Sequence, residues 1–266
     1  MRIGFIGGGT MAEAIIAGAR AAGLETEIAV GEPVKARRDA LARYKVETTA
    51  DNRVAVKGAG IVVLAVKPQQ FDAAAAGLKA ALSPDQTVLS IMAGVKMHSL
   101  GLKLNHRRLI RVMPNTPAQI RQGMCVWTAS PEVPAEHLAF TQKMLAAIGD
   151  ELKFSEEKYI DMATALSASG PAYVFMFIES LTDAGVLLGM PNDVARRLAV
   201  KTVLGSAALL QESGKHPAEL RNGVTSPGGT TAAGLLALEH GGFRAATIRA
   251  VKAAYERGEE LGASTK

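Results

Sequence analysis

The chain has 266 residues, enough for one large domain or two of ordinary size. Hydrophobic residues make up 48% and charged residues 21%, the balance of a globular protein, and the formal net charge is +5. The basic residues are spread out, and their one cluster, "NHRRLIR" at 105–111, is short and contains no aromatic residue. These features argue against a nucleic-acid surface and leave room for a small anionic ligand.

Other features of the sequence argue against a secreted, membrane-bound or metal-binding protein. Cys125 is the only cysteine, in the apolar stretch "MCVW", so we expect a buried thiol and no intrachain disulfide. The start "MRIGFIGGG" turns to glycine before the apolar core of a signal peptide would form. Glu179 and Asp183 interrupt the longest apolar run, and the histidines lack metal-ligand spacing. We therefore expect a cytoplasmic protein with no membrane span and no metal site.

Short β-rich runs alternate with helical stretches through the first half of the chain. Continuous aliphatic runs such as "IVVLAV" are typical of strands buried on both faces, and their alternation with helices predicts a parallel, doubly wound sheet. The expected strands are 2–7, 27–32, 61–66, 87–92, 108–114 and 124–129, and the first expected helices are 10–22 and 34–44.

After about residue 155 the pattern becomes helical. Helices are expected over 171–189, over 192–213 and from 231 onward, with Ser167 or Ser169 capping the first of them. These helices are apolar around most of their circumference, so they need partners on several sides. The expected fold class is α/β: an N-terminal Rossmann-type dinucleotide-binding domain (1–155) and a C-terminal all-helical substrate and dimerisation domain (156–266).

The stretch "IGFIGGGTMAEAI" places Gly7, Gly9 and Ala12 directly after the first strand and at the start of a helix. This is the spacing and context of the dinucleotide-binding fingerprint. Gly7 permits a tight turn, Gly9 lets the backbone approach a pyrophosphate, and Ala12 keeps the helix close to the sheet. The helix N-terminus then supplies N–H groups and positive potential to the pyrophosphate.

The residues after the second strand leave the choice of cofactor open. Glu32 lies where a carboxylate would accept hydrogen bonds from the ribose hydroxyls of NADH and repel the 2′-phosphate of NADPH. Lys35, Arg37 and Arg38 follow closely, and they would pair with that phosphate or form a solvated helix face. Both cofactors, NADPH and NADH, therefore remain candidates.

Several further motifs occur in a characteristic order. They are "GFIGGGTMA" (4–12), "AVKP" (65–68), "RVMPNTPA" (111–118), "LSASGPAYVFMFIE" (166–179), "TSPGGTT" (225–231) and "EHGGFRAA" (239–246). Together they resemble the pyrroline-5-carboxylate reductase family over essentially the whole chain, and the pair "SGPAY" and "SPGGTT" is its most specific part. "AVKP" and the glycine motif are shared with related dehydrogenases.

The resemblance implies the last enzyme of proline biosynthesis, built as an interlocked homodimer or a pentamer of dimers. Glu32 departs from the family pattern, which often has a small polar residue there. By the resemblance, Ile6, Gly7, Gly8, Gly9, Thr10 and Met11 would line the pyrophosphate, Asn52 would contact the adenosine end, Ala65, Val66, Lys67, Pro68 and Ala93 would bound the nicotinamide, and Glu157, Thr230 and Thr231 would face the substrate.

The substrate implied by the resemblance, 1-pyrroline-5-carboxylate, is a cyclic imine with one carboxylate. The N–H groups of a Gly-Gly turn at a helix N-terminus would hold that carboxylate, which implicates Ser226, Gly228 and Gly229. We expect Thr231 to be catalytic, orienting the ring nitrogen or relaying a proton to it. The alternatives are another imine or 3-hydroxyacid reductase, an S-adenosylmethionine methyltransferase, and a non-catalytic dinucleotide sensor.

Overall fold

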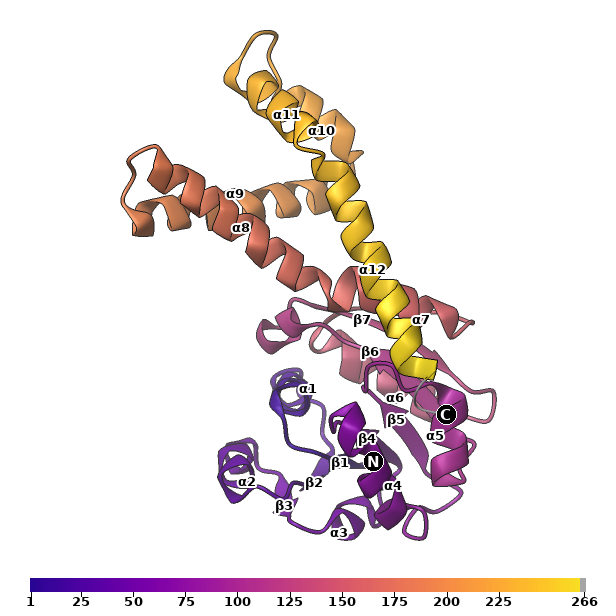
Figure 1. The fold of residues 1–266 in the computed structure, drawn as a ribbon. Helices are drawn as coiled ribbons and strands as arrows, with labels where there is room; N and C mark the ends of the chain where they lie inside the picture. Colours follow the sequence, from indigo (N-terminus) through magenta and orange to yellow (C-terminus); the bar gives the residue numbers. More distant parts are fainter. Residues whose placement is uncertain (264–266) are drawn as a thin grey trace. The chain divides into compact units, whose positions relative to one another are not determined.

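A computed structural model describes residues 1–263 of the chain (Figure 1). The chain forms two compact units. Of the described residues, the first unit contains 1–169 and 254–263, and the second contains 170–253. Each is described by itself below.

The first unit is built on an eight-stranded sheet with the order β3-β2-β1-β4-β5-β6-β7-β8 among the described residues. The strand order reverses between β1 and β4, which both run parallel to their neighbours. The strands are β1 (Arg2–Ile6), β2 (Glu27–Gly31), β3 (Glu47–Thr49), β4 (Ile61–Leu64), β5 (Thr87–Ser90), β6 (Leu109–Met113), β7 (Gly123–Ala129) and β8 (Gly149–Lys153).

The predicted strands are confirmed, with three differences. The sheet is not parallel throughout, because β7 pairs antiparallel with β6. Two strands, β3 and β8, were not predicted, and both lie at the edges of the sheet. Their sequences, "ETT" and "GDELK", are short or charged and largely exposed, so they lack the apolar pattern of a strand buried on both faces.

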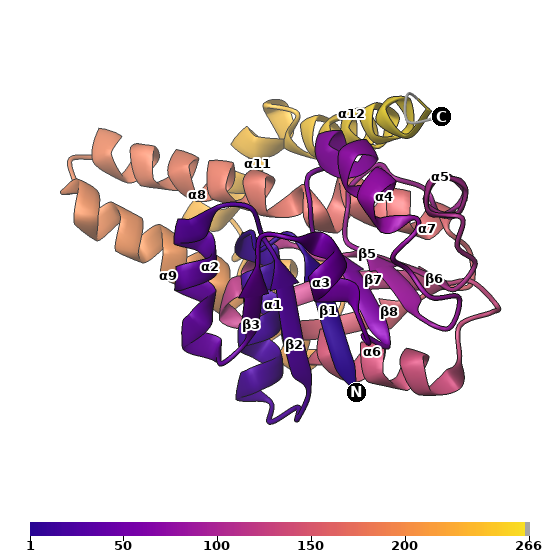
Figure 2. The same ribbon diagram turned by 90° about the horizontal axis from the view of Figure 1, so that it is seen from below.

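Helices cover both faces of this sheet (Figure 2). One face packs against α1 (Thr10–Ala21), α2 (Lys35–Leu41) and α6 (Ala135–Ala146). The other face packs against α3 (Asn52–Val56), α4 (Phe71–Leu78) and α5 (Met97–Leu104). The arrangement is the predicted doubly wound α/β fold. The 3₁₀ turns of this unit are η1 (Ala42–Tyr44), η2 (Pro68–Gln70) and η3 (Thr116–Ile120).

A π-helical segment, η4 (Thr164–Ala168), joins α7 (Lys158–Ala163) to the next helix. The N–H of Ser169 donates to the Thr164 carbonyl at 2.9 Å, the i to i−5 pattern of a π-helix. Ser167 lies inside this segment, and Ser169 has helical angles (φ −82°, ψ −25°). The expectation that either serine caps a helix is therefore wrong, since a capping residue has extended backbone.

The second unit contains helices only. They are α8 (Gly170–Leu187), α9 (Asn192–Ser213), α10 (Pro217–Gly223), α11 (Thr230–His240) and the start of α12 (Phe243–Ala263), whose last turns belong to the first unit. The predicted long helices are confirmed, and α10 is an additional short one. α8 and α9 pack closely where a Cβ on Gly185 would lie 2.8 Å from the Ala195 Cβ.

The second unit has almost no core within one chain. Of residues 170–253, only Thr182, Ala195 and Ala199 are buried. Large apolar side chains such as Phe175, Leu187 and Leu204 are exposed instead. Helices with this much exposed apolar surface need partners outside the unit. No helix in residues 1–263 is long and apolar enough to cross a membrane.

Candidate active site

The glycine loop between β1 and α1 brings free backbone N–H groups to the end of the sheet. Gly7 has φ +96°, and a Cβ there would lie 2.7 Å from the Ala65 carbonyl oxygen, so only glycine fits. Gly9 is the N-cap of α1, no atom lies within 4 Å of the position that a Cβ would take there, and no side chain caps the helix. The first N–H groups of a helix lack intrahelical partners, so this end of α1 can accept an anion.

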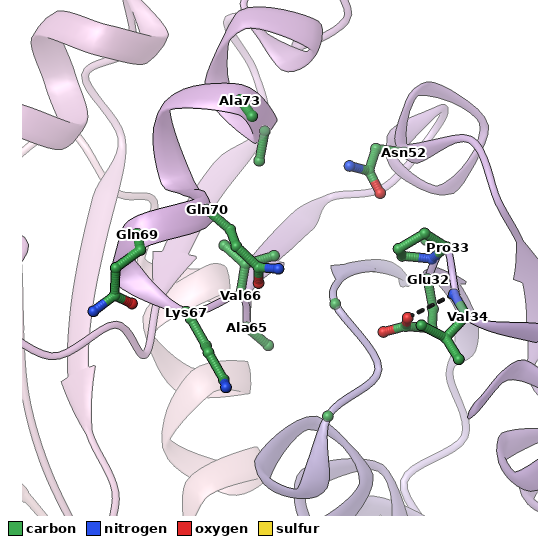
Figure 3. A pocket seen from close by; sticks show the side chains of 14 residues that line it. Glu32, Pro33, Val34, Asn52, Ala65, Val66, Lys67, Gln69, Gln70 and Ala73 are labelled. Carbon is green, nitrogen blue, oxygen red and sulfur yellow. Dashed lines mark hydrogen bonds between the residues drawn. The ribbon is translucent and has the colours of Figure 1, made fainter. Parts of the chain in front are cut away.

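A cleft of about 580 Å³ lies beside this loop, in the size range of small-molecule and cofactor sites. It opens where the strand order reverses between β1 and β4, the position at which doubly wound sheets bind ligands. Figure 3 shows Glu32, Pro33 and Val34 on one side of the cleft and Val66, Lys67 and Gln70 on the other.

Glu32 is a buried wall residue of this cleft, with 8% of its surface exposed. Its Oε2 accepts a hydrogen bond from the Gly8 N–H at 2.8 Å, and its Oε1 accepts one from the Val34 N–H at 2.9 Å. The carboxylate therefore ties the glycine loop to the loop after β2. Two main-chain donors hold its charge in place.

The cations that follow Glu32 are engaged elsewhere. Lys35 pairs with Asp39 at 2.7 Å, and Arg37 lies 3.7 Å from a carboxylate oxygen of Glu13. Arg38 donates to the main-chain carbonyls of Glu32 and Pro33 at 2.7 and 2.8 Å. None of the three basic side chains lines the cleft.

The structure brings together seven of the thirteen predicted cofactor residues as cleft lining. These are Gly7, Gly9, Glu32, Asn52, Ala65, Val66 and Lys67. The other six lie outside the lining: Ile6, Gly8, Thr10, Met11, Pro68 and Ala93. Ile6 is fully buried, whereas Thr10 is exposed at the start of α1 and Ala93 is exposed on the loop that follows β5.

Sequence reasoning missed further lining residues. They are Gly31, Pro33, Val34, Gln69, Gln70, Ala73 and Ala74. They are the last residue of β2, residues that come just after β2, and residues that come just after "AVKP". Their positions at the carboxyl ends of strands could therefore have identified them. Gly31 has a clear reason to be glycine, since a Cβ there would lie 2.4 Å from the Asn52 Oδ1.

Glu157 belongs to a hydrogen-bonded network that the sequence did not reveal. Its Oε1 accepts from the Met97 N–H at 2.7 Å and from Arg111 Nη1 at 2.8 Å. Arg111 is fully buried in β6, and its Nη2 donates to Asp161 Oδ1 at 2.7 Å. The network joins β6, α7 and the start of α5.

A second link joins the π-helical segment to the sheet. The amide of Asn115 donates to the carbonyl and the hydroxyl of Ser167 at 3.3 and 3.4 Å, and its oxygen accepts from the Met124 N–H at 2.8 Å. Both ends of this side chain are therefore used to hold the "PNTP" loop in place.

In the second unit, "TSPGGTT" forms a turn between α10 and α11. The Gly229 N–H donates to the Ser226 carbonyl at 3.1 Å, and Gly228 has φ +67°, which with Pro227 fits a type II turn. A Cβ on Gly229 would lie 2.3 Å from the Ser226 Oγ. Gly229 is the N-cap of α11 and has no side-chain cap, so the first N–H groups of that helix are available to an anion. Thr230 is exposed and Thr231 is half-buried at the start of α11.

A dinucleotide fits the first unit, because the loop has room at Gly9, free N–H groups at α1 and a carboxylate after β2. The fold and the cleft therefore define a dinucleotide-binding protein of the Rossmann class. A pyrroline-5-carboxylate reductase from Synechocystis sp. is 44% identical over 265 residues, covering 98% of each chain. The chain belongs to the pyrroline-5-carboxylate reductase family, whose members are NAD(P)-dependent oxidoreductases.

Other comparisons cover both units. Residues 2–94 match the family model "NADP oxidoreductase coenzyme F420-dependent", and residues 157–261 match "Pyrroline-5-carboxylate reductase dimerisation". The relative from Pisum sativum is 41% identical, covering 97% of this chain and 95% of its own.

Solved structures of pyrroline-5-carboxylate reductases agree with this assignment. The one from Coxiella burnetii is 37% identical and has a TM-score of 0.90, covering 97% of each chain. The one from Plasmodium falciparum, solved with NADP bound, is 29% identical and has a TM-score of 0.89, covering 98% of each. With the apolar exposure of residues 170–253, these findings identify a homo-oligomer that acts on a small molecule.

Proposed function

We propose that the protein reduces 1-pyrroline-5-carboxylate to L-proline with NADH or NADPH, the last step of proline biosynthesis. One observation carries the proposal: a chain of this family holds a dinucleotide cleft in one unit and a Ser-Pro-Gly-Gly turn at a helix N-terminus in the other. The first is suited to a pyrophosphate, and the second is suited to a small carboxylate.

Bound NADH or NADPH would supply the hydride that is added to the imine carbon. Around it, residues 6–11 would line the pyrophosphate, the free main-chain N–H groups at the start of α1 would bind it, and Asn52 would contact the adenosine end. Ala65 to Pro68 with Ala93 would bound the nicotinamide. The free N-terminus of α1 and the open side of Gly9 support the first of these assignments.

The substrate assignments follow from the turn before α11. The Gly228–Gly229 turn, closed by the bond from the Gly229 N–H to the Ser226 carbonyl, would present the free main-chain N–H groups of Thr230 and Thr231 to the carboxylate. The Thr231 hydroxyl would orient the ring nitrogen and relay to it a proton from water, which completes the reduction and leaves the hydroxyl protonated. The family resemblance implies that Glu157 also faces the substrate; in the first unit its carboxylate accepts a hydrogen bond from the Met97 N–H.

The proposal also assigns the assembly and the domains. Residues 1–155 would form the cofactor domain, and residues 156–266 would form an interlocked homodimer that covers the exposed apolar helices. Five such dimers would form the larger assembly that the family resemblance implies. Light scattering after gel filtration distinguishes two chains from ten, and a monomer would refute interlocking. The proposal places the enzyme in the cytoplasm, which cell fractionation tests.

The test is an absorbance assay of cofactor oxidation with 1-pyrroline-5-carboxylate, run with NADH and with NADPH. A 3-hydroxyacid or an acyclic imine replaces the substrate in parallel assays to test the alternative reductases. Thr231→Ala should lower kcat about tenfold to a hundredfold with little effect on the KM for the cofactor. Thr247→Ala, which removes an exposed hydroxyl on α12, should change neither constant. Equal turnover of Thr231→Ala and the unmodified enzyme would remove Thr231 from the mechanism.

A further inference from the structure

The carboxylate of Glu32 is fixed in the cleft by the main chain on both sides. The Gly8 N–H holds Oε2 at 2.8 Å, and the Val34 N–H holds Oε1 at 2.9 Å, a bond drawn in Figure 3. A Cβ on Gly8 would lie 3.3 Å from the Glu32 Cβ, so the loop packs directly on this side chain. A buried carboxylate that accepts two main-chain hydrogen bonds cannot turn into solvent to avoid an incoming charge.

The surrounding cations do not neutralise this charge within the cleft. Lys35 and Arg37 face the carboxylates of Asp39 and Glu13 on the helical surface. Arg38 is bound to main-chain carbonyls through Nη1. A 2′-phosphate at the end of β2 would therefore meet a fixed negative charge, and the one basic side chain among the cleft-lining residues, Lys67, lies on the opposite side of the cleft (Figure 3).

We propose that Glu32 makes this enzyme prefer NADH over NADPH. In Rossmann folds the adenosine ribose lies beside the end of β2, where a carboxylate accepts hydrogen bonds from the ribose hydroxyls. A 2′-phosphate carries about two negative charges at neutral pH, so it is repelled at the same place. The inference rests on the proposed function. It concerns Glu32 of this chain and not the whole family, because one relative was solved with NADP bound.

The kinetic test compares kcat/KM for NADH and NADPH at saturating 1-pyrroline-5-carboxylate. The unmodified enzyme should favour NADH by about tenfold or more, which corresponds to about 1.4 kcal/mol. Glu32→Ser and Glu32→Gln remove the charge and should reduce the ratio at least about tenfold, through a lower KM for NADPH. Glu27→Gln is the matched control: the same change at the exposed start of the same strand should leave the ratio unchanged.

A binding test needs no turnover. Calorimetry on the unmodified oligomer should show that 5′-AMP binds at least about tenfold tighter than 2′,5′-ADP, which differs from it only by the 2′-phosphate, and that Glu32→Gln removes the difference. This measurement decides the case if Glu32→Ser does not fold. A preference for NADPH, or a ratio that stays the same in the Glu32 variants, would overturn the inference while leaving the proposed function standing. Selective binding of 5′-AMP over 2′,5′-ADP without any imine turnover would refute the proposed function and retain the role of Glu32.

Discussion

Arg111→Met should destabilise the α/β unit by about 3 kcal/mol. The Arg111 side chain is fully buried and bonds Glu157 at 2.8 Å and Asp161 at 2.7 Å, while those two side chains are 28% and 13% exposed. Removing one partner from a buried ion pair costs about 3–5 kcal/mol, because the remaining charge loses its compensation. The lower end applies here, since both carboxylates keep some contact with water.

Urea unfolding followed by tryptophan fluorescence measures this effect within the correct unit. Trp127 is the only tryptophan and is buried in β7, opposite Val112 of the strand that carries Arg111. With a denaturant slope of about 2 kcal/mol per molar, the midpoint should fall by about 1.5 M.

Arg108→Met is the control for this measurement, because Arg108 directly precedes β6, the strand that carries Arg111. The ion-pair partner of Arg108 is Asp85, whose side chain is 89% exposed. A surface pair contributes about 0–1 kcal/mol, so this midpoint should fall by less than about 0.5 M. Equal shifts for Arg108→Met and Arg111→Met would refute the argument that the buried network stabilises the unit. Adding Glu157→Gln and Asp161→Asn to Arg111→Met should recover part of the loss, since no unpaired charge then remains.

Three further predictions follow from single positions. Gly7→Ala should weaken calorimetric cofactor binding more than about tenfold, because its Cβ would lie 2.7 Å from the Ala65 carbonyl; unchanged affinity would contradict the loop geometry. Burial raises the pKa of the Cys125 thiol to about 12, so a thiol reagent at about pH 8 should modify it only after unfolding, and rapid native labelling would refute this. Burial lowers the pKa of His137, so the unfolded chain binds the proton first as the pH falls. The contribution of the neutral His137 side chain to the free energy of unfolding is therefore present above about pH 6.5 and is lost as the pH falls below it. The urea midpoint should therefore drop less between about pH 7.5 and pH 5.5 in His137→Asn than in the unmodified protein.

The sequence predicts the central sheet and the cofactor end of the cleft because their signals are local. "IVVLAV" must be a buried strand, and the glycines of "GFIGGGTMA" follow a strand and precede a helix. The edge strands β3 and β8 carry no such signal, because an exposed edge tolerates charged residues. The direction of β7 is set by its pairing with β6, which local pattern does not specify.

The network at Arg111 could not be predicted for a different reason. Glu157 and Asp161 follow Arg111 by 46 and 50 residues in the chain, so only the folded structure brings the carboxylates to the arginine. The same holds for Asn115 and Ser167, which are 52 residues apart. The position of Glu32 was predicted, but its bonds to Gly8 and Val34 were not, because main-chain donors leave no pattern in a sequence.

The most direct test of the proposed reaction is the stoichiometry of its products. Purified protein is incubated with 1-pyrroline-5-carboxylate and limiting NADH or NADPH, and chiral chromatography then measures proline against the cofactor oxidised. We predict one equivalent of L-proline for each equivalent of reduced cofactor, with no oxidation when the imine is omitted. Cofactor oxidation without L-proline, or no oxidation by folded, oligomeric protein with either cofactor, would contradict the assignment.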